Sequence, residues 1–140
     1  MPDKKKFIDT NVLVYAYDTS AGKKHGIARD LIVGLWDSGL GVVSTQVLQE
    51  FFVLATRKLP VPLDDRTAKE IIADLLKWTV IVNDGDSILS AIELHRKRKY
   101  SFWDALIIDS AVRGGADTLL SEDLSHGQVI YGVSIHNPFV

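Results

Sequence analysis

Residues 6–17 read KFIDTNVLVYAY, and this stretch contains the clearest fold signal of the chain. A short apolar run ends at Asp9 and is followed by the small polar residues Thr10 and Asn11. A short run of this kind is typical of a strand buried in a parallel sheet. A negative charge at the end of a buried strand favours a functional site, although Asp9 or Thr10 can also cap the next segment. Residues 11–17 fit either a strand or a short helix.

Farther along the chain, short β-type runs alternate with segments of helical period. This alternation is typical of a parallel sheet with crossover helices, and we therefore predict an α/β fold. One domain over residues 1–140 is expected, because the length suits one core and no repeat or linker interrupts the chain. The predicted strands are 6–9, 41–44, 79–82, 118–120 and a piece of 129–135. The predicted helices are 25–36, 45–58 and 63–77, followed by one helix capped by Asp86 and one capped by Ser101. The helix at 63–77 is expected to turn five apolar side chains toward the core, those of Ala68, Ile71, Ile72, Leu75 and Leu76.

Composition limits the classes of protein to be considered. The chain has 140 residues, a formal net charge of −2 and no cysteine, which excludes disulfides and thiolate metal sites. The charge gives no global attraction to nucleic acid, so such a partner would depend on a local basic patch or on metal ions. No apolar run reaches the roughly 18 residues of a membrane span, and the N-terminus lacks the apolar segment of a signal peptide. We expect a cytoplasmic protein without membrane association.

Four acidic residues far apart in the chain are the main functional candidates. Asp9 and Asp123 follow predicted strands, whereas Glu50 and Asp104 lie on helices that begin near the same end of the sheet. In open parallel sheets the ligand crevice lies beyond this end, which we call the carboxyl edge. Converging carboxylates without cysteine indicate a hard divalent cation such as Mg²⁺ or Mn²⁺, and chemistry on phosphate.

Each candidate also has a structural interpretation. Asp104 can be the partner of Ser101 in a helix capping box, and Asp123 can be an ordinary turn residue. Glu50 lies beside the apolar stripe of its helix rather than opposite it, which favours a functional role. Because clustered carboxylates repel one another, we expect the pKa values of some of them to be raised when no metal is bound.

A basic run at residues 96–99 precedes Asp104 and three aromatic residues, Tyr100, Phe102 and Trp103. Its cations can hold RNA phosphates, with Arg96 and Arg98 as the candidate contacts, or they can be the solvated C-terminus of a helix. For Phe102 and Trp103 we favour positions in the core over stacking on a base.

Five pieces of the chain together resemble the PIN domain, and the VapC-type toxin ribonucleases in particular. They are FIDTNVLVYA (7–16), Glu50 in the second long helix, SFWDALIIDSA (101–111), LLSEDL (119–124) and GVSIHNPF (132–139). They stand in the order of the family, and the resemblance extends over essentially the whole chain. It implies a three-layer sandwich in which a central parallel sheet is flanked by helices.

The resemblance also implies a site and an activity. One or two Mg²⁺ or Mn²⁺ ions would be bound by Asp9, Glu50, Asp104 and Asp123 for endonucleolytic cleavage of RNA. Asn11 matches a polar residue that hydrogen-bonds within the acidic cluster, and Ser121 keeps the hydroxyl of a position that is often Thr. The implied partners are the RNA substrate, a cognate antitoxin of a type II toxin–antitoxin system and a second copy of the chain.

Two other classes are considered beside the nuclease. An aspartate-nucleophile phosphohydrolase of the haloacid-dehalogenase type also begins with an Asp at a strand end, but it needs a second Asp where Asn11 stands. A non-catalytic interaction module with a PIN-like fold usually lacks one or more of the acidic residues. Because all four are present here, the sequence favours the nuclease.

Overall fold

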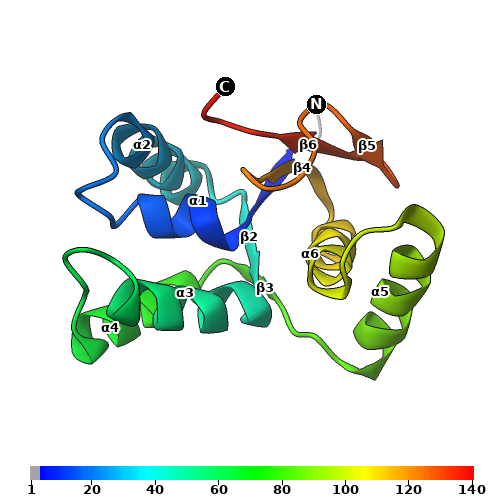
Figure 1. Cartoon of the computed structure of the whole chain (residues 1–140), viewed down its shortest axis with the longest axis horizontal. Helices are drawn as coiled ribbons and strands as arrows, with labels where there is room; N and C mark the ends of the chain where they lie inside the picture. Colours follow the sequence, from blue (N-terminus) through cyan, green and yellow to red (C-terminus); the bar gives the residue numbers. More distant parts are fainter. Residues whose placement is uncertain (1–3) are drawn as a thin grey trace.

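The computed structural model describes residues 4–140 and confirms the predicted α/β fold. Its sheet has six strands in the order β3-β2-β1-β4-β6-β5 (Figure 1). Five of the strands are parallel, whereas β5 pairs antiparallel with β6. The strands are β1 (Lys5–Ile8), β2 (Gly41–Ser44), β3 (Thr79–Ile81), β4 (Ala116–Leu120), β5 (Val129–Ile130) and β6 (Val133–His136).

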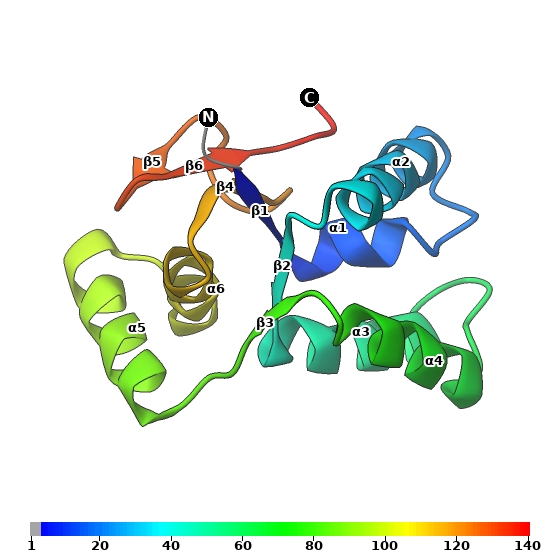
Figure 2. The same cartoon turned by 180° about the vertical axis from the view of Figure 1, so that it is seen from behind.

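Helices cover both faces of the sheet, which gives the three layers expected from the resemblance. Four of them lie on one face and α5 and α6 on the other, as the views from the front and from behind both show (Figures 1 and 2). The helices are α1 (Thr10–Tyr15), α2 (Lys23–Ser38), α3 (Thr45–Arg57), α4 (Asp65–Leu75), α5 (Gly85–Arg98) and α6 (Phe102–Arg113). No helix among residues 4–140 is long and apolar enough to cross a membrane.

The ambiguous segment after Asp9 is a helix. Asp9 is the N-cap of α1, with an extended backbone, and its side chain accepts a hydrogen bond from the Thr10 N–H. Val12, Leu13 and Val14 are all buried, because α1 packs against both α2 and α3. A helix buried on several sides has no polar face, so its sequence looks like that of a buried strand.

Two local predictions were wrong. The N-cap of α5 is Asp84, not Asp86, because Asp84 and Ser87 form a reciprocal capping box two residues earlier than expected. Leu76, predicted to point inward, is the C-cap of α4 and is 56% exposed. Successive helical residues are about 100° apart, and Leu75, which is fully buried, is the one that faces the core.

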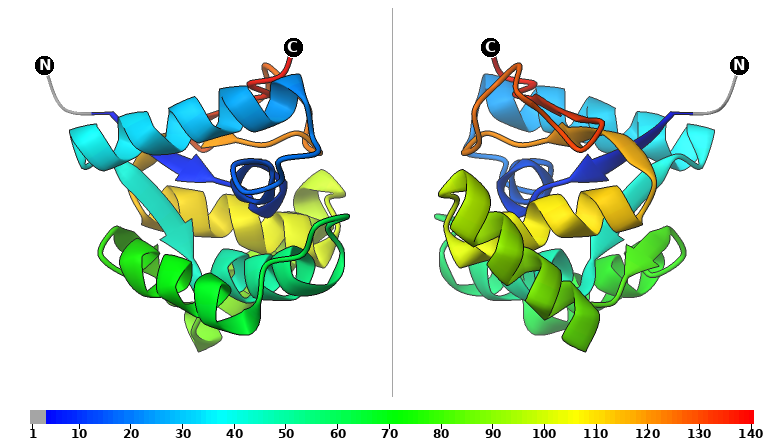
Figure 3. Two further views of the ribbon diagram at one scale, coloured as in Figure 1. Left: turned by 90° about the vertical axis from the view of Figure 1, so that its left-hand side faces the viewer. Right: turned by 90° about the vertical axis from the view of Figure 1, so that its right-hand side faces the viewer.

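The order of the strands brings distant segments together at the carboxyl edge. β1 lies between β2 and β4 and is parallel to both, with Phe7 opposite Val42 and Leu119. These three apolar side chains are fully buried. The chain segments that follow β1 and β4 therefore lie side by side, and α3 begins directly after β2 at the same edge (Figure 3).

Candidate metal centre

The four predicted acidic residues line one cavity of about 110 Å³ at the carboxyl edge. They come from the end of β1, from α3, from the first turn of α6 and from the loop after β4. We call this space the acidic cavity, and it is lined by Asp9, Thr10, Asn11, Gln46, Glu50, Leu54, Trp103, Asp104, Ile107 and Asp123.

Asp9 is half-buried, and both of its carboxylate oxygens accept hydrogen bonds. Oδ1 accepts from the Thr10 N–H at 2.7 Å and Oδ2 from the Ser121 hydroxyl at 2.8 Å. Burial raises the pKa of Asp9 to about 6, against the two hydrogen bonds, which lower it. The charges of Asp123 and Glu50 raise the pKa further but contribute less than burial. The pKa of Asp9 is therefore raised as expected, but the main cause is desolvation of the carboxylate rather than repulsion between carboxylates.

Glu50 is joined to the strand end through Thr10. The Thr10 hydroxyl donates to Glu50 Oε1 at 2.9 Å, and Thr10 itself is only 5% exposed. A buried residue of α1 thus restrains an exposed carboxylate of α3. Gln46 lies one helical turn before Glu50, so both side chains reach the acidic cavity. Sequence reasoning missed Gln46, although its spacing of four residues from Glu50 placed it on the same helix face.

Asp123 is in contact with Asn11. The Asn11 Nδ2 donates to Asp123 Oδ2 at 2.5 Å, across 112 residues of sequence. Burial, followed by the charges of Glu122 and Asp104, raises the pKa of Asp123, and the bond from Asn11 opposes this rise. Asn11 and Ser121 therefore each donate to a different carboxylate at the same edge.

The loop that carries Asp123 is anchored through its neighbour Glu122. The Tyr15 hydroxyl donates to Glu122 Oε1 at 2.8 Å, and Lys24 forms an ion pair with Oε2. Lys24 also lies over the Tyr15 ring, with Nζ 5.1 Å from the ring centroid. These contacts hold the loop against α1 and α2, and sequence reasoning missed them because the three residues belong to no common motif.

Asp104 has its backbone capped while its carboxylate lines the acidic cavity. The Ser101 hydroxyl accepts from the Asp104 N–H at 3.1 Å. Among residues 4–140, the Asp104 carboxylate makes no return bond to the Ser101 N–H, so the predicted capping box is only half formed. The cap orients this turn and leaves the carboxylate available to a ligand.

Trp103 lies at the acidic cavity rather than in the core, where it was predicted. Its side chain is 62% exposed, whereas its neighbour Phe102 packs against the core. Successive helical residues are about 100° apart, so only one of two adjacent aromatic rings can face inward. The two rings meet edge to face, with centroids 5.2 Å apart.

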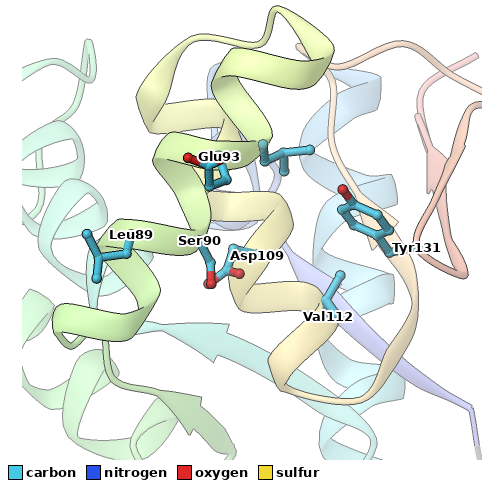
Figure 4. Close-up of a pocket in the computed structure, with 7 residues that line it drawn as sticks. Leu89, Ser90, Glu93, Asp109, Val112 and Tyr131 are labelled. Atoms are coloured by element: carbon cyan, nitrogen blue, oxygen red, sulfur yellow. The ribbon is translucent and has the colours of Figure 1, made fainter.

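Arg96 and Arg98 do not line the acidic cavity. Arg96 forms an ion pair with Glu93 at 3.0 Å, and Arg98 Cζ lies 5.8 Å from the centroid of the Tyr131 ring. Tyr131 lies in the turn between β5 and β6, where it lines a second cavity of about 380 Å³ together with residues of α5 and α6 (Figure 4). Asp109 also faces this second cavity and pairs with Arg113 at 2.7 Å, away from the acidic one.

The chemistry of the acidic cavity suits Mg²⁺ or Mn²⁺. Its ionisable ligands are all carboxylates, which hard cations prefer. Within residues 4–140, however, no three Asp, Glu, His or Cys side chains are close enough together to ligate one ion as they stand. Binding by these carboxylates therefore requires side-chain rotation or contact through hydration water, several molecules of which Mg²⁺ usually keeps.

Three solved structures with the same fold are a toxin and two toxin–antitoxin complexes. VapC20 of Mycobacterium tuberculosis, a sarcin–ricin loop cleaving toxin, is 23% identical, with a TM-score of 0.65 over 85% of this chain and 90% of that chain. A toxin–antitoxin complex from Klebsiella pneumoniae has a TM-score of 0.67 at 18% identity, over 96% of this chain and 98% of that chain. DNA-bound VapBC of Salmonella typhimurium has a TM-score of 0.65 at 17% identity, over 97% of this chain and 99% of that chain.

Sequence comparison identifies the family independently of these structures. No curated protein matches the chain. The PIN domain matches residues 6–129, which is most of the chain and includes every residue that lines the acidic cavity. This chain therefore belongs to the PIN domain family.

Proposed function

We propose that the chain is an endoribonuclease dependent on Mg²⁺ or Mn²⁺, and the toxin component of a type II toxin–antitoxin pair. The observation that carries this proposal is the convergence of four carboxylates, from four separate segments, on one cavity. Three of them accept hydrogen bonds from side chains of neighbouring elements, so they are oriented by the fold rather than by solvent. The donors are Thr10, Asn11 and Ser121.

Hydrolysis of a phosphodiester requires an oriented water and neutralisation of the charge that develops on the phosphate. A bound divalent cation supplies this neutralisation and makes water more acidic. In the proposal, Asp9, Asp104 and Asp123 provide the main oxygen ligands, and Glu50 adds a carboxylate that Thr10 restrains. The products expected from the resemblance have a 5′ phosphate and a 3′ hydroxyl.

Trp103 is proposed to contact an unpaired base of the RNA. Its ring is largely exposed and lines the same cavity as Asp104, so a stacked base would lie beside the reacting phosphate. Every base has a face that stacks on an aromatic ring, so such a contact tolerates different sequences. Arg96 and Arg98, which lie outside the cavity, would contact phosphates farther along the strand.

The proposed protein partners are a cognate antitoxin and a second copy of the chain. The likeness to toxin–antitoxin complexes over nearly the whole chain supports the antitoxin. Exposed apolar residues on α3 and at the end of α4, such as Val53 and Leu76, provide surface for such contacts.

Cleavage of a mixed RNA pool tests the proposed activity. Purified protein is incubated with Mn²⁺ or Mg²⁺, with EDTA, and as the Asp104→Asn variant, and the fragment ends are identified. We expect cleavage that requires the metal and is lost in the variant. Activity that survives the substitution would indicate a contaminant. Absence of cleavage by folded, metal-bound protein over many RNA pools would favour a non-catalytic PIN-like module.

A further inference from the structure

Gln46 contains a buried polar atom that lacks a partner. The residue is 6% exposed, and its Oε1 accepts no hydrogen bond within residues 4–140. Only one other buried side-chain atom in this part of the chain is unpaired, the Trp78 Nε1. Buried polar groups nearly always have a partner, so each exception requires an explanation.

The position of Gln46 indicates what the missing partner is. The residue lines the acidic cavity, where Asp9, Glu50, Asp104 and Asp123 are the other polar acceptors, although its Oε1 is itself closed to solvent. The neighbouring donors are already used, because the Thr10 hydroxyl bonds Glu50 and the Asn11 amide bonds Asp123. An acceptor among acceptors requires a donor from outside the protein.

A hydrated cation in the acidic cavity provides such a donor once the Gln46 side chain rotates and turns its Oε1, which is closed to solvent as it stands, toward the hydration water. Water bound to a divalent ion points its hydrogens away from the ion, toward surrounding acceptors. The four carboxylates are too widely spaced for three of them to ligate one ion as they stand, which favours contact through hydration water. A neutral carbonyl can accept a hydrogen bond from that water without adding a fifth negative charge to the cavity.

We propose that Gln46 is a positioning residue of the metal centre, whose side-chain carbonyl accepts a hydrogen bond from water in the hydration shell of the bound Mg²⁺ or Mn²⁺. This role rests on the proposed function, because it presupposes a cation in the acidic cavity. Gln46 holds the water and does not itself ligate the ion.

Titration of Mn²⁺ by calorimetry, with thermal unfolding of the metal-free protein, tests the role of Gln46. The variant Gln46→Met keeps the length of the side chain and removes its polar atoms. We expect the affinity for Mn²⁺ to fall about tenfold or more, as on loss of other groups that support metal ligands. We also expect the metal-free variant to unfold at the same temperature as the wild type or higher, because an unpaired buried acceptor has been removed.

The variant Gln46→Glu distinguishes an acceptor from a donor. Glu keeps an oxygen where the carbonyl lies and in its ionised form cannot donate, so at a pH where it is ionised we expect it to retain or raise the affinity for Mn²⁺. If the two variants lose affinity equally, the Gln46 amide acts by donating to a carboxylate and the proposal is wrong. Wild-type affinity in Gln46→Met would equally overturn it and leave Gln46 a packing residue.

Gln49→Met is the matched control, since Gln49 is an exposed glutamine of the same helix outside the acidic cavity. It should bind Mn²⁺ as the wild type does. A separate comparison with Asp9→Asn tests the underlying metal site. If the wild type and Asp9→Asn bind Mn²⁺ equally, the proposed metal centre is wrong, and the role of Gln46 is wrong with it. If Asp9→Asn loses affinity for Mn²⁺ and Gln46→Met binds it as the wild type does, only the role of Gln46 is rejected.

Discussion

The Ser121 hydroxyl donates a 2.8 Å hydrogen bond to Asp9 Oδ2 across 112 residues of sequence. It joins the chain just after β4 to the chain just after β1, and Ser121 is fully buried. Burial raises the pKa of Asp9 to about 6, while this bond lowers it. Asp9 is therefore ionised at neutral pH, yet its charge is poorly solvated, and a bound cation would relieve that cost.

Binding of Mn²⁺ should stabilise the wild type and not Asp9→Asn. A ligand that binds only the folded state at a concentration of 100 times its Kd adds about 2.7 kcal/mol, which raises the Tm of a chain of this size by roughly 5–10 °C. Thermal unfolding with and without Mn²⁺ measures the shift. The Asp109 carboxylate pairs with Arg113 outside the acidic cavity, so the variant Asp109→Asn should keep the increase in Tm that Mn²⁺ causes. Equal shifts in the wild type and Asp9→Asn would contradict the site.

The stability of the metal-free protein should depend on pH through Asp9. The pKa of this carboxyl is about 6 in the folded protein against an ordinary value of 3.8, so the folded state holds the proton more tightly. The unfolding free energy of the wild type should therefore fall, relative to that of Asp9→Asn, as the pH rises from about 3 to about 7, by roughly 3 kcal/mol in total. Urea unfolding at several pH values measures this difference. Parallel pH profiles for the two proteins would show that Asp9 is not the titrating group.

The bond between Thr10 and Glu50 should matter for both stability and metal binding. Thr10→Val keeps the shape of the buried side chain and removes the hydroxyl that holds Glu50. We expect the variant to lose about 1 kcal/mol of stability and to bind Mn²⁺ more weakly, because Glu50 is no longer restrained. Thr10→Ser restores the hydroxyl and should restore metal affinity. Equal affinities in the valine and serine variants would exclude a role for this bond.

Trp103→Ala should weaken RNA binding without unfolding the protein. Loss of one stacking contact removes about 1–3 kcal/mol of binding free energy, and stability should change little because the ring is 62% exposed. Fluorescence anisotropy with a labelled single-stranded RNA measures the affinity, in an Asp104→Asn background that leaves the RNA intact. Trp103→Phe should retain much of the affinity. Trp36 is also exposed but lies on α2, so Trp36→Ala should have no effect, and the same loss in both alanine variants would argue against stacking at Trp103.

Arg96 and Arg98 should contribute to the salt dependence of RNA binding. Each phosphate contact on single-stranded RNA contributes about 0.7 to the slope of log K against log salt, so replacing both by alanine should reduce the slope by roughly 1.4. The control is replacement of Arg66 and Lys69, two exposed cations of α4, which makes the same change in net charge. Equal effects of the two double variants would indicate a general effect of charge rather than contacts at α5.

Local sequence determined the elements and the types of group at the site. Periodicity and caps are properties of neighbouring residues, so the parallel strands, most helices and the Ser101 cap of α6 were predictable. The four acidic residues were predictable as candidates because Asp9 and Asp123 follow strands, Asp104 lies in the first turn of a helix, and Glu50 lies beside the apolar stripe of α3. Their order along the chain also carried the resemblance to the PIN domain.

Tertiary structure alone decided which atoms meet. The bonds of Thr10 to Glu50 and of Ser121 to Asp9 join elements that no local pattern relates. The exposure of Trp103 depends on which of two adjacent rings α6 turns toward the core, and the unpaired oxygen of Gln46 depends on what the other walls of the cavity offer. Local patterns extend over a few residues, whereas a cavity is made by strand order and helix packing across the whole chain. Residue identity thus sets the chemistry available to the site, whereas packing across the chain sets how its groups are held and which of them still require a partner.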